Sequence, residues 1–154
     1  MTVALKTSSD TARFAAASAL QKVLPELVGL EINAKQAHWN VVGPAFLPLH
    51  TLTDAIAADA RDWADRVAER AVALGFAVDA RPGTVAARAR QFPAGRVVDR
   101  EAIVELAEII EHVAATARSL LDKLEQTDVV AHDLMVEMLE GLDKYGWMLQ
   151  AQSR

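Results

Sequence analysis

A chain of 154 residues, 52% of them hydrophobic, is long enough to form a single domain with its own core. Its formal net charge of −5 argues against a strongly basic nucleic-acid binder, and the absence of cysteine excludes disulfides and thiol chemistry. The opening residues lack the charged-then-apolar pattern of a signal peptide, and no apolar run is long enough to span a membrane. We therefore expect a cytoplasmic protein with no membrane partner.

The helical spacing of apolar residues predicts two helices in the first half of the chain. Residues 1 to about 9 are expected to form a short flexible N-terminus, followed by a helix that ends at about Trp39. Gly43-Pro44 then forces a short turn, so a second helix from about residue 46 to 74 should run antiparallel to the first. Gly75 is the expected C-cap of this second helix.

The second half of the chain begins with a long connection, residues 75–98, which is rich in glycine and proline and has a short helix expected at 84–90. Two further helices are expected at about 99–125 and 127–150. A connection of this length between two helix hairpins is typical of the crossover in ferritin-like bundles. We therefore predict an all-α, ferritin-like four-helix bundle, formed as one domain over residues 1–154, with a short helix in the crossover.

Residues capable of metal binding gather on one face of the second helix. Because each residue turns an α-helix by about 100°, His50, Asp54, Asp65 and Glu69 fall within roughly one quadrant. His38 lies just before the preceding turn. Imidazole and carboxylate together are ligands for a first-row metal ion such as Fe²⁺, Mn²⁺ or Zn²⁺. An acidic stripe is also typical of a solvated helix face, so the spacing alone leaves both interpretations open.

The axial spacing of these residues indicates that one helix cannot complete a single site. Asp54 and Asp65 are separated by about 16 Å along a straight helix, whereas ligands of one ion each lie about 2 Å from it. The pairs His50/Asp54 and Asp65/Glu69 therefore serve separate sites, or a second chain completes each site. An antiparallel two-fold pairing of the helix near residue 60 would place each pair against the other pair of the second chain.

The segment KQAHWNVVGPAFLPLH, followed by Asp54 and then by ADRVAERAVALG, resembles the Dps family of ferritin-like mini-ferritins. The resemblance extends over nearly the whole chain, including the crossover helix and the sequence LDKYGW near the end. It implies a hollow homo-dodecamer that acts as a ferroxidase. In this family Fe(II) is oxidised by hydrogen peroxide or oxygen at inter-subunit sites that hold up to two irons. The ferric product is stored as mineral, which protects against oxidative damage.

This resemblance also assigns residues. His38, His50 and Asp54 match one subunit's share of the ferroxidase ligands, and Asp65 and Glu69 match the share that the two-fold partner donates. The division agrees with the axial spacing, which does not depend on the resemblance. The Glu-x-x-His motif of ordinary ferritins is absent, because the residues three before the four histidines are Lys35, Leu47, Ile109 and Val129.

Two neighbours of the site are assigned catalytic roles in the same way. Trp39 matches a tryptophan beside the site that is thought to quench one-electron oxidants, and a core anchor is the alternative role. Lys35 matches a lysine near the second metal position of some members, where it would lower the charge or weaken binding of the second metal.

The acidic start of the fourth helix has two interpretations. Asp128, Asp133 and Glu137 match the place where family members line a three-fold pore for iron entry. Acidic residues in a first helical turn also cap the helix and interact favourably with its dipole. Both roles stay open at this stage.

DNA binding is the alternative function, because some family members compact DNA in the nucleoid through lysine-rich tails. Here the chain has only Lys6 and Arg13 before residue 14. The basic cluster lies on the crossover instead and consists of Arg81, Arg88, Arg90, Arg96 and Arg100. Phosphate neutralisation needs several clustered cations, so we expect no direct DNA binding.

Overall fold

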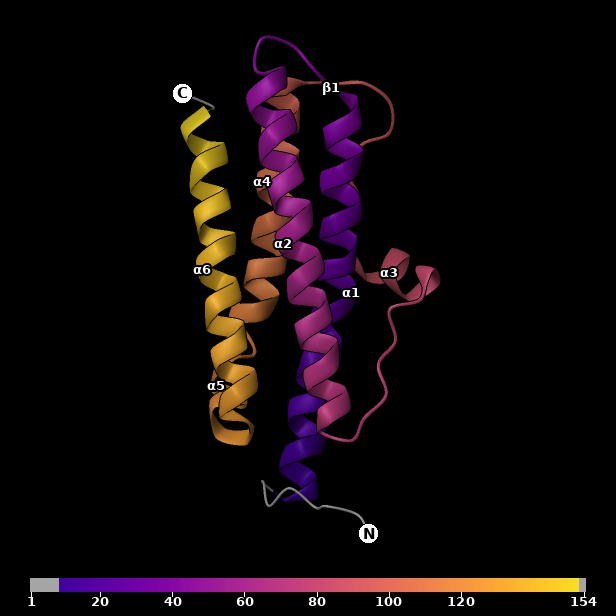
Figure 1. Cartoon of the computed structure of the whole chain (residues 1–154), viewed down its shortest axis with the longest axis vertical. Coiled ribbons are helices and arrows are strands. Elements are labelled where there is room, and N and C mark those ends of the chain that lie inside the picture. Colours follow the sequence, from indigo (N-terminus) through magenta and orange to yellow (C-terminus); the bar gives the residue numbers. More distant parts are fainter. Residues whose placement is uncertain (1–8, 153–154) are drawn as a thin grey trace.

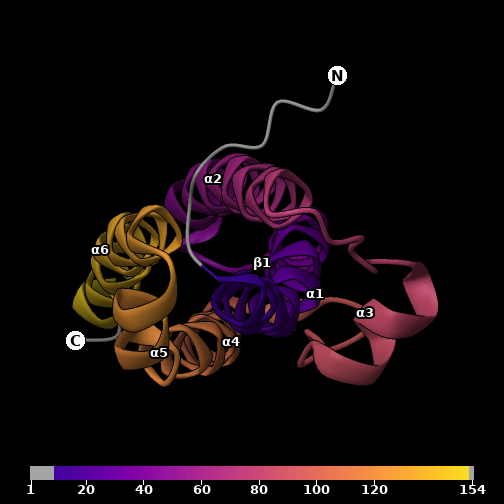
Figure 2. The same cartoon turned by 90° about the horizontal axis from the view of Figure 1, so that it is seen from below.

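The computed structural model describes residues 9–152, so the expectation of a flexible segment before Ser9 lies outside the described part of the chain. Four long helices form the bundle: α1 (Asp10–Asn40), α2 (Phe46–Ala73), α4 (Asp99–Arg118) and α6 (Val129–Gln152). Figures 1 and 2 show them side by side with their axes roughly aligned. The predicted all-α, ferritin-like four-helix bundle is therefore confirmed, and none of the described helices is long and apolar enough to cross a membrane.

The chain forms two helix hairpins joined by a long crossover. α1 and α2 run antiparallel, and the crossover then returns along the length of the bundle to the start of α4 (Figure 1). The crossover contains the short helix α3 (Pro82–Arg88), which lies outside the four-helix core against α1 (Figure 2). It starts two residues earlier than expected because Pro82 suits the first turn of a helix.

Local sequence explains where the helices begin and end. The Ser9 hydroxyl accepts a hydrogen bond from the Ala12 amide at 3.3 Å and caps α1. α2 ends at Ala73 with Leu74 as its C-cap, one residue before the predicted Gly75, whose φ of +95° is a left-handed conformation that favours glycine. Large apolar side chains fill the bundle interior, with Leu27, Ile56 and Leu106 among those fully buried.

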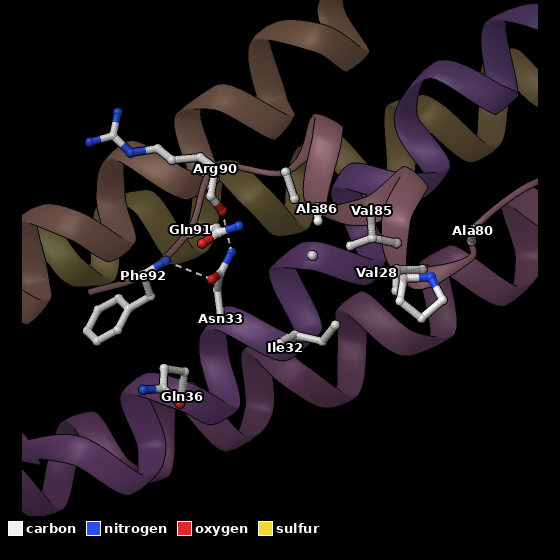
Figure 3. Close-up of a pocket in the computed structure, with 13 residues that line it drawn as sticks. Val28, Ile32, Asn33, Gln36, Ala80, Val85, Ala86, Arg90, Gln91 and Phe92 are labelled. Atoms are coloured by element: carbon white, nitrogen blue, oxygen red, sulfur yellow. Dashed lines mark hydrogen bonds between the residues drawn. The ribbon is translucent and has the colours of Figure 1, made fainter. Parts of the chain in front are cut away.

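Two amide side chains of α1 hold the crossover in place. Gln21 donates to the Asp79 carbonyl at 2.8 Å and accepts from the Asp79 amide at 2.9 Å. Further along α1, Asn33 donates to the Arg90 carbonyl at 2.6 Å and accepts from the Phe92 amide at 2.8 Å (Figure 3). Each amide therefore satisfies backbone groups of an irregular segment, which would otherwise lack partners where they are buried.

The structure differs from the expectation in two places. The third helix was expected to continue to residue 125, but it ends at Arg118, and a separate short helix, α5 (Leu121–Thr127), follows. The Leu120 amide bonds the Ala117 carbonyl in a tightened turn, and the Ser119 hydroxyl donates to the Thr116 carbonyl at 2.7 Å. In addition, β1 (Val41–Val42) and β2 (Val97–Val98) form an unpredicted parallel pair that joins the ends of the two connections.

Candidate metal centre

The two predicted histidine ligands lie against each other at the junction of α1 and α2. His38 lies in the last turn of α1, and His50 lies in the second turn of α2. Their ring centroids are 3.6 Å apart and the ring planes differ by 20°, so the imidazoles are stacked. The Phe46 ring also lies near His50, with its centroid 5.1 Å away. The short turn between the helices therefore brings together two histidines that are 12 positions apart.

The hydrogen bonds of these histidines determine which ring nitrogen is free. His38 Nδ1 bonds the His50 carbonyl at 2.8 Å, and His50 Nδ1 bonds the His38 carbonyl at 3.0 Å. A carbonyl oxygen only accepts, so Nδ1 must carry the proton in both rings. Each neutral imidazole then has its lone pair on Nε2, the tautomer that suits a metal ligand. The reciprocal bonds orient both rings before any metal arrives.

Asp54 lies one helical turn after His50 and is paired with Lys35. The hydrogen bond from the Lys35 ammonium, followed by its charge, holds the pKa of Asp54 below the usual value of 3.8. Asp54 is thus a carboxylate at neutral pH, and Lys35 places a positive charge at the same position. Lys35 therefore contacts one of the predicted metal ligands, Asp54, in this structure.

Asp65 and Glu69 lie further along the same helix and face solvent. Neither carboxylate has an ion pair or a side-chain hydrogen bond within residues 9–152, whereas most arginines of the chain are paired with an acid. α2 is continuous from Phe46 to Ala73, so the expected separation between this pair and His50/Asp54 applies. In the described part of one chain, no three His, Asp or Glu side chains gather closely enough to hold a metal ion. A single chain therefore carries two half-sets of candidate ligands.

Trp39 is 69% exposed, beside His38 at the end of α1. A role as a core anchor within one chain is excluded by this exposure. The side chain is free to approach a second subunit or a small oxidant.

The three acidic residues at the start of the last helix differ in their surroundings. Asp128 is buried, accepts from the Ala131 amide at 2.7 Å and pairs with Arg70 at 2.6 Å. Glu137 pairs with Arg66 at 2.5 Å, and Asp133 is exposed and forms no ion pair or side-chain hydrogen bond with another described residue. The capping role therefore applies to Asp128, a role that sequence reasoning left open.

A separate cavity of about 380 Å³ lies between α1 and the crossover (Figure 3). Its walls are mainly apolar and include Val28, Ile32 and Val85, with Asn33 and Arg90 at one side. It lacks histidine and carboxylate side chains, so it does not offer a second metal site.

Comparisons with known proteins agree with this architecture. Residues 17–154 match the ferritin-like domain family. The DNA protection during starvation protein of Mycolicibacterium smegmatis is 31% identical over 145 residues, which cover 93% of this chain and 79% of the relative. The fine tangled pili major subunit of Haemophilus ducreyi is 31% identical over 137 residues, which cover 88% of this chain and 72% of that relative.

Solved structures are similar over almost the full length. Dps from Microbacterium arborescens in the high iron form is 35% identical with a TM-score of 0.90, and the match covers 95% of this chain and 97% of that one. The tetragonal form of Mycobacterium smegmatis Dps is 29% identical with a TM-score of 0.91, covering 99% and 94% of the two chains. The chain therefore belongs to the Dps family of ferritin-like proteins, which serve in iron storage and in protection against oxidative damage.

Proposed function

We propose that this chain is a ferroxidase that oxidises Fe²⁺ with hydrogen peroxide at sites shared between two subunits of a hollow dodecamer. The observation that carries the proposal is the division of ligands along α2. Two imidazoles with free Nε2 atoms lie near its start, and the unpaired carboxylates of Asp65 and Glu69 lie about 22–28 Å further along the helix. Neither half-set is complete, and both lie on one face.

An antiparallel pairing of two α2 helices near residue 60 would join the half-sets. The surface there is a groove between α1 and α2, with Ala58, Ala64 and Ala68 among its lining residues. Small side chains allow two backbones to approach closely. Arg61 and Glu31 also line the groove and form an ion pair at 2.6 Å, so their charges are already balanced. Two identical sites would result, one on each side of the two-fold axis.

Apolar side chains outside this groove favour a larger assembly than a dimer. Leu47 is 67% exposed, Trp147 is 64% exposed and Val129 is 71% exposed. Leu47 and Trp147 lie together on a groove between α2 and α6, and Val129 lies at the opposite end of α6. Exposed apolar patches of this kind mark interaction surfaces, and two such surfaces besides the two-fold face are what a closed shell of subunits needs.

The charges of the joined site favour one tightly bound Fe²⁺. Asp54, Asp65 and Glu69 bring three negative charges, and Lys35 offsets one of them. One Fe²⁺ neutralises the remaining two, so a second Fe²⁺ finds no net negative charge to attract it and is held more weakly. The predicted capacity of up to two irons per site then divides into one strong and one weak position.

The complete reduction of one hydrogen peroxide molecule requires two Fe²⁺ ions. Hydrogen peroxide takes two electrons and two protons to become two water molecules, and each Fe²⁺ supplies one electron. The chain's residues bind and orient the iron through neutral imidazole and carboxylate ligands, a set that suits iron. Trp39 lies beside the site, where a one-electron oxidant that escapes would meet its indole ring.

An anaerobic Fe²⁺ titration of the assembled protein, followed by addition of peroxide or of oxygen, tests this proposal. We expect one tight Fe²⁺ per subunit, a weaker second one, and faster oxidation with peroxide than with oxygen. His38→Ala should abolish tight binding, whereas His112→Ala, which removes a histidine on α4 outside the site, should leave it intact. Equal loss of tight binding in both variants would contradict the proposal.

DNA compaction has less support as the function. Arg81 pairs with Asp79 at 2.9 Å, and Arg90 pairs with Glu108, so two of the five arginines in the predicted basic cluster are already neutralised; Arg100 of that cluster lies in α4, not in the crossover. Fewer free positive charges therefore remain for binding phosphate groups, which needs several clustered cations.

A further inference from the structure

Tyr145 is the only tyrosine of the chain, and it lies between α6 and α2. Its side chain is 6% exposed, and its hydroxyl donates to Asp59 Oδ2 at 2.6 Å. Burial, followed by the hydrogen bond to Asp59, raises the pKa of Tyr145 well above its usual value. The phenol is therefore neutral at all physiological pH values, and its proton points at a carboxylate. The ferroxidase ligand set does not use either residue.

A buried indole adjoins this pair. Trp63 is 7% exposed, and its ring meets the Tyr145 ring edge to face, with centroids 6.4 Å apart and an angle of 61°. The Trp63 ring lies directly on the backbone of Gly141, where an added Cβ would be 2.4 Å from Trp63 Cζ2. Gly141 and Tyr145 are one turn apart on α6, so this helix holds the indole against the phenol.

Asp59 and Trp63 lie between the two ligand half-sets along the axis of α2. Asp59 follows Asp54 by about 8 Å along the axis of α2 and precedes Asp65 by about 9 Å. Trp63 is two residues before Asp65. By helical geometry Asp59 and Trp63 point away from the ligand face, across α2 and toward α6. An electron that leaves Trp63 therefore needs to cross only the width of one helix to reach a ligand position.

We propose that Tyr145, with Asp59 as its proton acceptor and Trp63 as the adjoining electron donor, is an internal one-electron reductant that quenches the radical formed when peroxide meets a site holding one Fe²⁺. The inference rests on the proposed ferroxidase function, because that function supplies the oxidant. It adds to Trp39 a second aromatic donor, which is buried and coupled to a base.

The electron and proton balance is complete. One Fe²⁺ gives one electron to hydrogen peroxide, the O–O bond breaks, and hydroxide and a hydroxyl radical form. Trp63 reduces the hydroxyl radical to hydroxide and recovers its electron from Tyr145, whose phenolic proton moves to Asp59. Solvent protons convert the two hydroxides to water. A second Fe²⁺ then reduces the tyrosyl radical, and the proton returns from Asp59, so two Fe²⁺ are oxidised per peroxide and no hydroxyl radical is released.

A purely structural role makes different predictions. A buried phenol needs a hydrogen-bond acceptor, and an edge-to-face aromatic pair contributes about 0.5–1.5 kcal/mol. Such a role would make Tyr145→Phe less stable, but it would not produce a radical on Tyr145 or make radical formation depend on a carboxylate at position 59.

Electron paramagnetic resonance of rapidly frozen samples, in which the Fe²⁺-loaded assembly is mixed with peroxide, tests the proposal. We expect a tyrosyl signal, which can arise only from Tyr145, and its loss in Tyr145→Phe together with greater capture of hydroxyl radical by a spin trap. Phe14→Leu, which removes an exposed aromatic ring of α1 outside the Tyr145–Trp63 pair, is the control and should keep the signal. Absence of a tyrosyl signal in the wild-type protein during active ferroxidation would overturn the proposal.

A second arm without iron separates this proposal from the proposed function. Azide radicals made by pulse radiolysis oxidise tryptophan in the metal-free assembly, and we expect tryptophanyl absorbance to convert to tyrosyl absorbance. In Asp59→Asn, which keeps the tyrosine but removes the base, conversion should slow by about a hundredfold, within the range that a positioned general base contributes. Conversion at the wild-type rate in Asp59→Asn would refute the role of Asp59. Normal conversion without any ferroxidation would support the relay and refute the proposed function.

Discussion

Gly141 offers a test of how tightly α6 packs on α2. An alanine methyl group at this position would lie 2.4 Å from Cζ2 and 2.8 Å from Cη2 of Trp63. Trp63 is buried beneath α6 and bordered by Tyr145, so its ring has little room to move. Gly141→Ala should therefore displace a large aromatic side chain or separate the two helices.

The magnitude follows from two opposing terms. Alanine is better than glycine in a helix interior by about 1 kcal/mol, whereas overpacking a core typically costs about 1–3 kcal/mol. Gly146 lies on the same helix, and an added Cβ there meets nothing within 4 Å. Gly146→Ala gains the propensity term alone, so the difference between the two variants isolates the clash. We expect Gly141→Ala to be less stable than Gly146→Ala by about 1–3 kcal/mol.

Thermal unfolding at one fixed protein concentration measures this difference, since assembly makes the melting temperature depend on concentration. For a chain of this length, 1 kcal/mol corresponds to about 2–4 °C, so Gly141→Ala should melt about 2–12 °C below Gly146→Ala. Equal melting temperatures would refute the packing argument and would mean that Trp63 moves freely beneath α6.

Three further predictions concern residues outside the metal centre. Asp128→Ala removes the cap of α6 and leaves Arg70 without its partner, so it should destabilise the protein by about 2–4 kcal/mol in denaturant unfolding; a loss below about 0.5 kcal/mol, the size of an ordinary surface change, would contradict this. Burial raises the pKa of Glu26, and Glu26 Oε2 has no hydrogen-bond partner among the described residues. Its ionised form thus costs stability at neutral pH and the cost disappears as the group protonates, so Glu26→Gln should raise the melting temperature at pH 7 and this gain should shrink toward pH 4. Finally, the assembly should not retard plasmid DNA in a gel at physiological salt, and a clear, salt-sensitive shift would show that the crossover arginines matter more than their ion pairs suggest.

Periodicity and turn chemistry were sufficient for most of the fold. The start of α2 at Phe46, its end just before Gly75 and the crossover with its short helix all follow from patterns within a few neighbouring residues. The break at Ser119 and Leu120 did not, because neither residue is a strong helix breaker and the break depends on hydrogen bonds formed locally in the folded chain. The pairing of Val41–Val42 with Val97–Val98 joins segments far apart in sequence, which periodicity cannot detect.

The candidate site, like the fold, has features that the sequence predicts and features that depend on tertiary packing. Helical geometry alone predicts that His50, Asp54, Asp65 and Glu69 share one face of α2. The His38 ring bonds the His50 carbonyl, and the His50 ring bonds the His38 carbonyl. Both hydrogen bonds depend on the conformation of the turn between α1 and α2, which no sequence pattern predicts. The hydrogen bond from Tyr145 to Asp59 is likewise a product of α6 packing on α2, across 86 positions of sequence.

The central claim is that each site takes ligands from two chains. His50→Ala and Glu69→Ala, each assembled alone, damage every site. In a dimer that contains one chain of each, one site carries both mutations and the other carries neither, so mixed assemblies should recover activity. Random co-assembly of equal amounts makes about half of the dimers mixed and restores about a quarter of the sites.

The measurement is the initial rate of peroxide-driven Fe²⁺ oxidation by the co-refolded mixture, compared with each parent and with wild-type protein, after mass spectrometry has confirmed mixed assembly. We expect a rate of about one quarter of wild type, well above both parents. A mixture no faster than its parents, although the chains have mixed, would contradict the inter-subunit site, since ligands from a single chain leave every subunit with its own defect.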